Sequence, residues 1–184
     1  MNQLKFLKWT ILSFLLVACG QNNDKKGGVK TNGSHWETFS QNGYTIKYPD
    51  SWSLNKTGEM GTELVVSSQL TSKNDFFKEN VNLVIQNLTG MNIDLDKYVK
   101  ISEGQILAML VDGKLIESSR QRNHNSEFHK LVYYSKMNSK TIKAEQYLWV
   151  KKEKAYVLTL CCEMDEFEKY KKTGEEILNS FSFN

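Results

Sequence analysis

Apolar and polar residues alternate over residues 44–48, a pattern typical of a strand with one buried face. Pro49 is expected to end this strand, because proline has no amide hydrogen to donate to a neighbouring strand. Two further runs, residues 62–69 and 80–88, are rich in β-branched and other apolar residues, and a polar, charged connection separates them. We expect both runs to form strands.

The period of the apolar positions changes after residue 93. From Asp94 onward they recur three, four or seven residues apart, which predicts a helix over residues 95–110. Asp94 is the expected N-cap, and Gly113 is the expected stop after the C-terminal end. Gly104 weakens a continuous helix, so two shorter helices remain an alternative.

Four strand-like runs follow the helix, and polar connections of a few residues join them. Short connections favour antiparallel neighbours, since parallel strands need a longer crossover. Apolar residues occupy both alternating sets of positions, for example Leu148 and Val150 against Tyr147 and Trp149, as in a sheet that is covered on both faces. The four runs are residues 114–122, 127–137, 141–152 and 155–164.

The chain closes with an amphipathic pattern over residues 165–181, which predicts a second helix. Asp165 and Glu168 have the spacing of a variant capping box. Gly174 lies on the apolar face, where it is expected to let the helix approach the sheet closely. The predicted fold class is therefore α/β (α+β), an antiparallel β-sheet meander sandwiched by a middle helix and a C-terminal helix.

The N-terminus carries Lys5 and Lys8 ahead of an apolar run of about ten residues, which is too short to cross a membrane that needs ~20. The run ends in Leu-Val-Ala before Cys19, which resembles the lipobox of bacterial lipoproteins. The resemblance implies cleavage between Ala18 and Cys19, acylation of the Cys19 thiol by palmitate or a similar chain, and export to the cell envelope. Gly20 is not the aspartate that retains lipoproteins at an inner membrane, so an outer membrane is favoured where one exists. An ordinary signal peptide or an uncleaved anchor remains the alternative.

The residues that follow Cys19 are polar, contain glycine and lack aromatic side chains, as in a flexible linker. The expected organisation is a lipoprotein signal peptide over residues 1–18, a flexible lipidated leash over 19–33 and a globular domain over 34–184. Loss of the two signal-peptide lysines lowers the formal net charge from +3 to +1. This charge gives no basic footprint for nucleic acid.

The two remaining cysteines, Cys161 and Cys162, are adjacent on a predicted strand. Their Cα atoms would lie ~3.8 Å apart, closer than the ~4.4–6.8 Å that disulfides prefer, and their side chains would point to opposite faces. We expect two buried thiols, with a redox pair as the less favoured interpretation.

The sequence shows no arrangement typical of a catalytic centre, a metal site or a cofactor site. His35, His124 and His129 lack the spacing of zinc ligands, and no Gly-x-Ser-x-Gly, His-Glu-x-x-His or glycine-rich phosphate loop is present. We therefore expect no catalytic residues, no metal and no cofactor. An enzyme whose site is assembled from scattered residues remains the alternative.

Aromatic residues fall on three successive predicted strands, and they have two interpretations. They can stack as cross-strand pairs beneath the helices. Alternatively, they can form an exposed surface for a peptide or a small hydrophobic ligand. The residues are Tyr133, Tyr134, Tyr147, Trp149 and Tyr156.

The opening Y-x-I-x-Y-P-x-x-W at residues 44–52 and the order of the elements over residues 36–183 resemble the PsbP-like superfamily, of the PsbP and DcrB type. The resemblance implies an α/β/α sandwich that serves as a binding or assembly module and has no shared catalytic centre. The sequence thus predicts a lipid-anchored, non-enzymatic envelope lipoprotein. Its expected partners are the membrane, through the lipid, and an envelope protein, a peptide or a small hydrophobic ligand, but no nucleic acid.

Overall fold

A computed structural model describes residues 35–124 and 126–184, so the predicted signal peptide, the leash, Ala18 and Cys19 lie outside the described residues. No helix in the described part is long and apolar enough to cross a membrane. The elements are β1 (Trp36–Gln41), β2 (Tyr44–Pro49), β3 (Ser53–Asn55), a 3-10 helix (Glu59–Gly61), β4 (Leu64–Ser67), β5 (Asn80–Asn87), α1 (Leu95–Met109), β6 (Lys114–Arg122), β7 (Glu127–Met137), β8 (Lys140–Lys151), β9 (Lys154–Glu163), α2 (Phe167–Ser180) and β10 (Ser182–Phe183).

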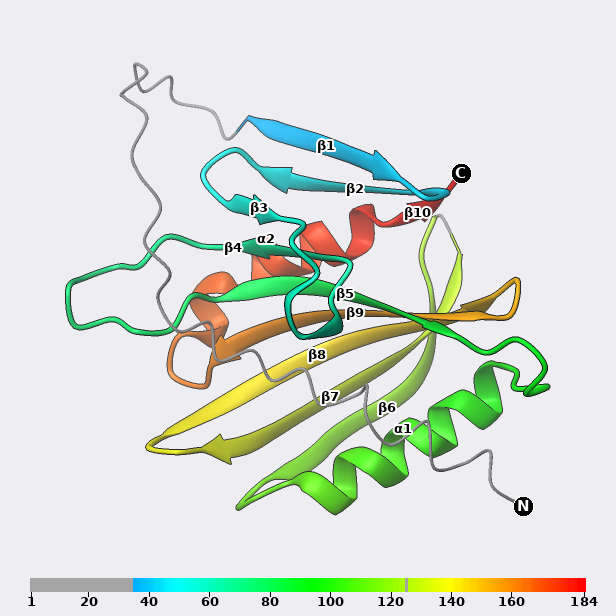
Figure 1. Cartoon of the computed structure of the whole chain (residues 1–184). Coiled ribbons are helices and arrows are strands. Elements are labelled where there is room, and N and C mark those ends of the chain that lie inside the picture. The colour runs from blue at the N-terminus through cyan, green and yellow to red at the C-terminus, as the bar shows by residue number, and fades with distance from the viewer. Residues whose placement is uncertain (1–34, 125) are drawn as a thin grey trace.

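The strands form two antiparallel sheets (Figure 1). The large sheet has the order β3-β4-β5-β9-β8-β7-β6, and it contains all six strands predicted after residue 60. The prediction of a single sheet is wrong for the first strand, β2, which lies in a small sheet between β1 and the C-terminal β10. The alternation of residues 44–48 indicates one buried face, but it does not identify the partner strands.

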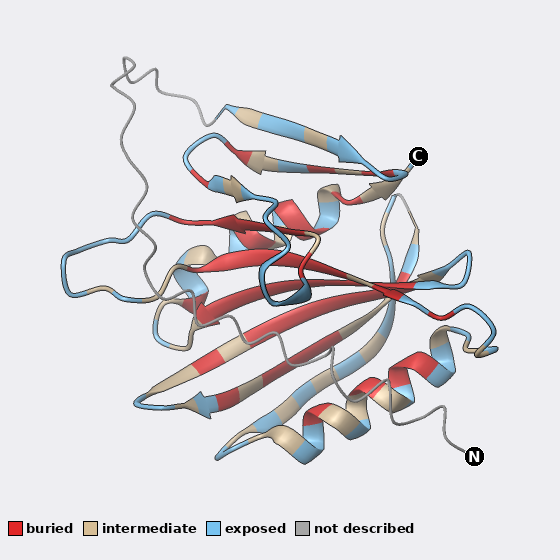
Figure 2. Cartoon of the chain, viewed as in Figure 1, coloured by how far each residue is buried: buried red, intermediate tan, exposed pale blue. Residues whose placement is uncertain are grey.

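Helices cover opposite faces of the large sheet, which confirms the predicted mixed α and β sandwich. Figure 1 shows α1 on the near face and α2 on the far face. The α2 helix contacts β2 of the small sheet as well as β9 and β5, whereas α1 lies against β8 and β6. Two hydrophobic clusters result, one on each face, and the strands between them are buried along their central parts (Figure 2).

The α1 helix is continuous, and its predicted N-cap is confirmed, since the Asp94 carboxylate accepts a hydrogen bond from the Lys97 amide at 2.9 Å. The predicted stop at Gly113 is wrong, because the helix ends at Met109 and Leu110 caps it in an extended conformation. Gly113 serves a different purpose. A Cβ atom there would lie 2.2 Å from the Tyr134 carbonyl oxygen, so only glycine fits beside β7.

The predicted capping box of α2 is wrong as well. Glu166 occupies the N-cap position and makes no side-chain capping hydrogen bond, while the Glu168 carboxylate lies 3.6 Å from Lys143 Nζ. The expected close approach at Gly174 is confirmed. A Cβ atom there would lie 2.5 Å from the methyl groups of Leu160, which is fully buried on β9.

Candidate functional site

The aromatic residues of the meander do not form an exposed binding surface. Tyr147, Trp149 and Tyr156 pack in the cluster beneath α2, whereas Tyr133 points to the opposite face, beneath α1. All four are at most 8% exposed, and Tyr134 is partly exposed. The interpretation as an exposed patch is therefore wrong, because both faces of these strands are covered. Ring contacts connect the three side chains beneath α2 with Phe128, Phe181 and Phe183.

Cys161 and Cys162 are free thiols, both buried, and their side chains lie in the clusters on opposite faces of the sheet. Burial raises the pKa of Cys161 to about 12 and also raises the pKa of Cys162. Since the thiolate is the reactive form, both groups are poor nucleophiles at neutral pH.

The three histidines lie apart. His35 and His124 are exposed, and His35 Nδ1 lies 3.7 Å from Glu37 Oε1. His129 is partly buried, and its Nε2 lies 2.8 Å from Ser118 Oγ. Burial and then the Arg120 guanidinium lower the pKa of His129, so its imidazole is neutral near pH 7. Within the described residues, no group of three or more His, Cys, Asp or Glu side chains could hold a metal ion.

Ser118 and His129 resemble the first two members of a nucleophile and base arrangement. A catalytic imidazole is normally oriented by a third group at its other nitrogen. In the part of the chain that the structure describes, His129 Nδ1 is buried and has no hydrogen-bond partner. The pair therefore lacks the group that would fix its tautomer.

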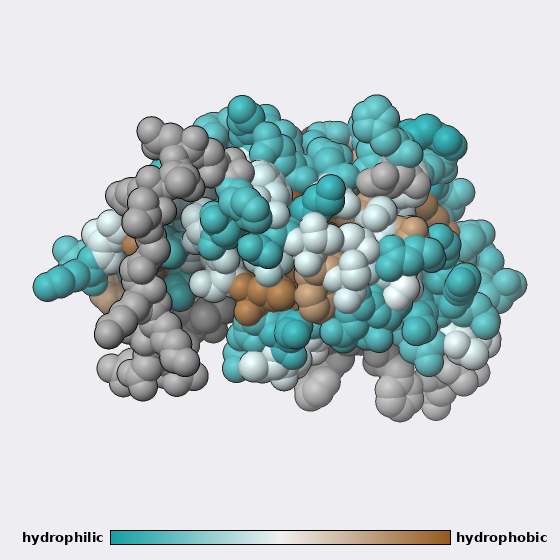
Figure 3. All heavy atoms as spheres, turned by 90° about the horizontal axis from the view of Figure 1, so that it is seen from above, coloured by the Kyte–Doolittle hydropathy of each residue, from teal (hydrophilic) through white to brown (hydrophobic). Residues whose placement is uncertain are grey.

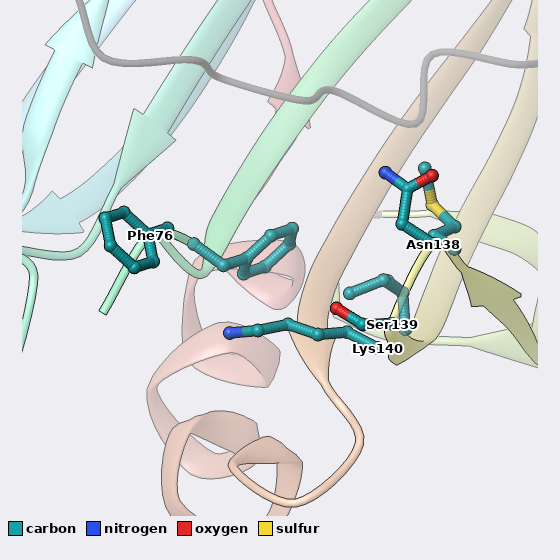
Figure 4. Close-up of a pocket in the computed structure, with 7 residues that line it drawn as sticks. Phe76, Asn138, Ser139 and Lys140 are labelled. Carbon is teal, nitrogen blue, oxygen red and sulfur yellow. The ribbon is translucent and has the colours of Figure 1, made fainter. Parts of the chain in front are cut away.

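An apolar pocket of about 140 Å³ lies at one end of the large sheet, between the β4–β5 connection and the β7–β8 turn (Figure 4). Its floor includes Ile142, which is 3% exposed, and Phe77 and Met137 are partly buried around it. The lining residues are Phe76, Phe77, Met137, Asn138, Ser139, Lys140 and Ile142.

Phe76 stands at the edge of this pocket and is 78% exposed, the most of any large apolar side chain described. The loop that carries it is ordered by Asp75, whose carboxylate accepts hydrogen bonds from the Thr71 amide at 2.8 Å, the Thr71 hydroxyl at 2.9 Å and the Phe77 amide at 3.1 Å. These hydrogen bonds lower the pKa of Asp75. The exposure of Phe76 is therefore held by a defined turn.

The charged member of the pocket is already neutralised. The Lys140 ammonium forms an ion pair with the Glu163 carboxylate. Figure 4 shows the Lys140 side chain reaching from β8 toward the loop that carries Phe76, with Asn138 and Ser139 on the other side. The aliphatic part of Lys140 thus adds apolar surface to the pocket, while its charge stays with Glu163.

Apolar side chains are scarce elsewhere on the visible surface. Seen from above, the described surface is mostly hydrophilic, and apolar residues gather only in small separate patches (Figure 3). No broad hydrophobic face is seen in that view.

Sequence reasoning missed this pocket. Phe76 and Phe77 fall in a connection whose other residues, apart from Leu70, are polar or charged, so the sequence indicates only a polar connection between strands. Two consecutive phenylalanines in such a link are the only local indication that it contributes to a site.

The model of the PsbP family matches residues 34–183 of the chain. The solution structure of the cyanobacterial PsbP protein CyanoP from Synechocystis sp. PCC 6803 has a TM-score of 0.56 at 16% identity, covering 88% of this chain and 98% of that chain. LpqN of Mycobacterium tuberculosis, described as involved in cell envelope biogenesis, has a TM-score of 0.61 at 18% identity, covering 83% and 92%. PA94 of Pseudomonas aeruginosa, a protein of unknown function, has a TM-score of 0.56 at 11% identity, covering 79% and 95%. Comparison with curated protein sequences gives no significant match.

Proposed function

This chain belongs to the PsbP family, and we propose that it acts as a non-enzymatic binding or assembly module that a lipid holds at the cell envelope. The predicted lipobox at Cys19 supports the anchor. The description of LpqN as involved in cell envelope biogenesis agrees with this location. An ordered apolar pocket with one projecting phenylalanine supports a binding role.

The observation that carries the binding role is Phe76. An exposed aromatic side chain costs solvation free energy in a monomer, and the Asp75 turn keeps it in that position. Aromatic anchors beside a small pocket are typical of the centre of a binding site. The pocket volume of about 140 Å³ suits one apolar side chain of an envelope protein or peptide, or one end of a small hydrophobic molecule.

Two variants test the pocket from opposite directions. Phe76→Ser removes the projecting ring, and Ser139→Trp fills the pocket from an exposed turn position without replacing a core residue. The full chain is immobilised, and the partner that it recovers from envelope extracts is measured. We expect recovery to fall about tenfold or more in both variants, since a central aromatic anchor contributes ~2 kcal/mol or more to the binding free energy. Leu107→Ser is the matched control, because Leu107 is an apolar side chain of α1 that is 58% exposed and does not line the pocket. Equal recovery by all four proteins would remove the pocket from consideration.

The anchor has a separate test. Cys19→Ala is expected to abolish palmitate labelling and processing, because it removes the acceptor thiol. Continued labelling of the variant would refute lipidation at this site. Fractionation of labelled cells then distinguishes an outer-membrane from an inner-membrane location in a double-membraned host.

An envelope enzyme is the second candidate, and the Ser118 and His129 pair favours it. This candidate predicts slow hydrolysis of an activated ester that Ser118→Ala abolishes and Ser119→Ala leaves unchanged. Equal rates for the two variants would count against it.

A further inference from the structure

A second pocket, of about 160 Å³, lies at the other end of β8 from the apolar pocket. Three lysines of the β8–β9 hairpin, Lys151, Lys152 and Lys154, stand on one side of it. The turn between β1 and β2 and the last residues of the chain form the other side.

The hairpin brings like charges close together, which does not favour its own stability. Lys151 and Lys154 are directly opposite each other in the β8–β9 register, so their side chains share one face. Like charges in this position destabilise a hairpin. The turn residues Lys152 and Glu153 have φ of 50° and 55°, which places a third ammonium at the tip.

Two nearby side-chain carboxylates, those of Glu153 and Glu63, make hydrogen bonds with other groups. Glu153, the acid of the same turn, accepts a hydrogen bond from the Gly90 amide at 3.2 Å, on the side of the β5–α1 connection. Glu63 accepts a hydrogen bond from Asn42 Nδ2 at 2.7 Å. Among the described residues, none of the three lysines forms an ion pair within 4 Å.

The floor of the pocket is aromatic. Tyr156 and Phe183 lie on it with ring centroids 4.9 Å apart, and Tyr156 is almost fully buried. Lys151 Nζ lies 4.3 Å from the Phe183 ring centroid, a cation–π contact that holds one ammonium over the floor. The pocket therefore offers several positive charges above an apolar base.

We propose that this pocket binds a phosphate-bearing ligand. Lysine ammoniums bind phosphate as point charges, and three of them around one hollow provide several hydrogen-bond donors for the oxygens of a phosphate group. The ligand is either the headgroup of an anionic phospholipid or a soluble phosphate compound, and the two share this chemistry. The proposal does not depend on the apolar pocket.

The test compares two double variants of the full chain, both in a Cys19→Ser background so that no acyl chain contributes to binding. Lys152→Gln with Lys154→Gln removes two charges from the pocket, and Lys171→Gln with Lys172→Gln removes two charges from α2. Binding to pyrophosphate is followed by NMR chemical shifts. Binding to vesicles is followed by sedimentation with phosphatidylglycerol and with phosphatidylcholine.

The pocket variant is expected to lose about tenfold or more in affinity, since each lysine near an anionic surface contributes ~1 kcal/mol, and the α2 variant is expected to lose little. Loss confined to phosphatidylglycerol vesicles identifies a lipid headgroup, and loss of pyrophosphate binding identifies a soluble phosphate compound. Equal losses in the two variants, or no binding of either probe by the parent protein, would overturn the proposal.

Discussion

At the residue scale, Glu145 and Lys130 form a largely buried ion pair on the α2 face of the sheet. Glu145 is 2% exposed, and Lys130 Nζ lies 3.1 Å from its carboxylate and 3.8 Å from that of Glu117. Burial raises the pKa of Glu145, and Lys130 opposes the rise. Removing one member of a buried ion pair leaves the other charge without compensation. The resulting loss of folding free energy is larger than the stabilisation that the intact pair provides.

We therefore expect Lys130→Met to lower the free energy of unfolding by about 3 kcal/mol at pH 7, as measured in urea. Lys136→Met is the matched control. Its ammonium lies 3.7 Å from Asp112 in an exposed pair, so its loss is expected to cost less than ~1 kcal/mol. Similar losses in the two variants would show that Glu145 is not left uncompensated.

His129 gives the fold a pH dependence with a defined sign. Its pKa in the folded protein lies below the ordinary ~6.5 of an unfolded chain. Between these two values the unfolded state binds more protons, so the contribution of His129 to stability falls as the pH drops from about 7 toward the folded pKa. Urea unfolding of the parent and of His129→Gln is expected to converge as the pH falls, whereas His124→Gln, at an exposed position, follows the parent throughout. A constant difference between the parent and His129→Gln would contradict this account.

At the element scale, replacing the two helical glycines by alanine is expected to change the stability of the fold in opposite directions. Gly174→Ala in α2 places a methyl group against the fully buried Leu160 and is expected to cost about 1–3 kcal/mol, despite the better helix propensity of alanine. Gly104→Ala in α1 meets nothing within 4 Å and is expected to stabilise the protein by up to ~1 kcal/mol. Thermal unfolding of the two variants should shift in opposite directions, and a shift of both in the same direction would contradict the packing described for α2.

The elements that the sequence predicts well are those whose residues repeat over eight or more positions. The strands β5 to β9 are long runs of eight or more residues bounded by polar turns, both helices have a period of 3.6 residues, and Asp94 marks a boundary through a local hydrogen bond. The sequence does not predict β1, because its two apolar residues, Trp36 and Phe39, lie three apart and do not alternate. The strands β3 and β10 have only three and two residues, too few to carry a period.

The candidate site, too, depends on contacts that no local sequence pattern shows. The meander aromatics attract attention in the sequence, yet their strands are covered on both faces, so they form core. Phe76 gains its importance from a loop that Asp75 orders and from a turn more than 60 residues later in the chain. Neither contact produces a local pattern, which is why both pockets required the structure.

At the scale of the whole molecule, the two proposed binding pockets lie at opposite ends of β8. The apolar pocket lies at the β7–β8 turn and the lysine pocket at the β8–β9 turn, so β8 spans the distance between them. Since β8 is paired on both sides, with β9 and with β7, it holds the two sites at a fixed separation. Under the two proposals, one domain contacts an apolar partner and an anionic group at the same time.

The most direct measurement of the proposed function is photo-cross-linking in intact cells, with a photoreactive residue placed at position 76 of the full chain and, as the control, at position 107. Both positions are exposed apolar sites, but only Phe76 borders the pocket. We expect one or a few envelope partners cross-linked at position 76 and little at position 107, with the position 76 products suppressed by Ser139→Trp. Equal patterns at the two positions, or no product at position 76, would contradict a binding role for this pocket.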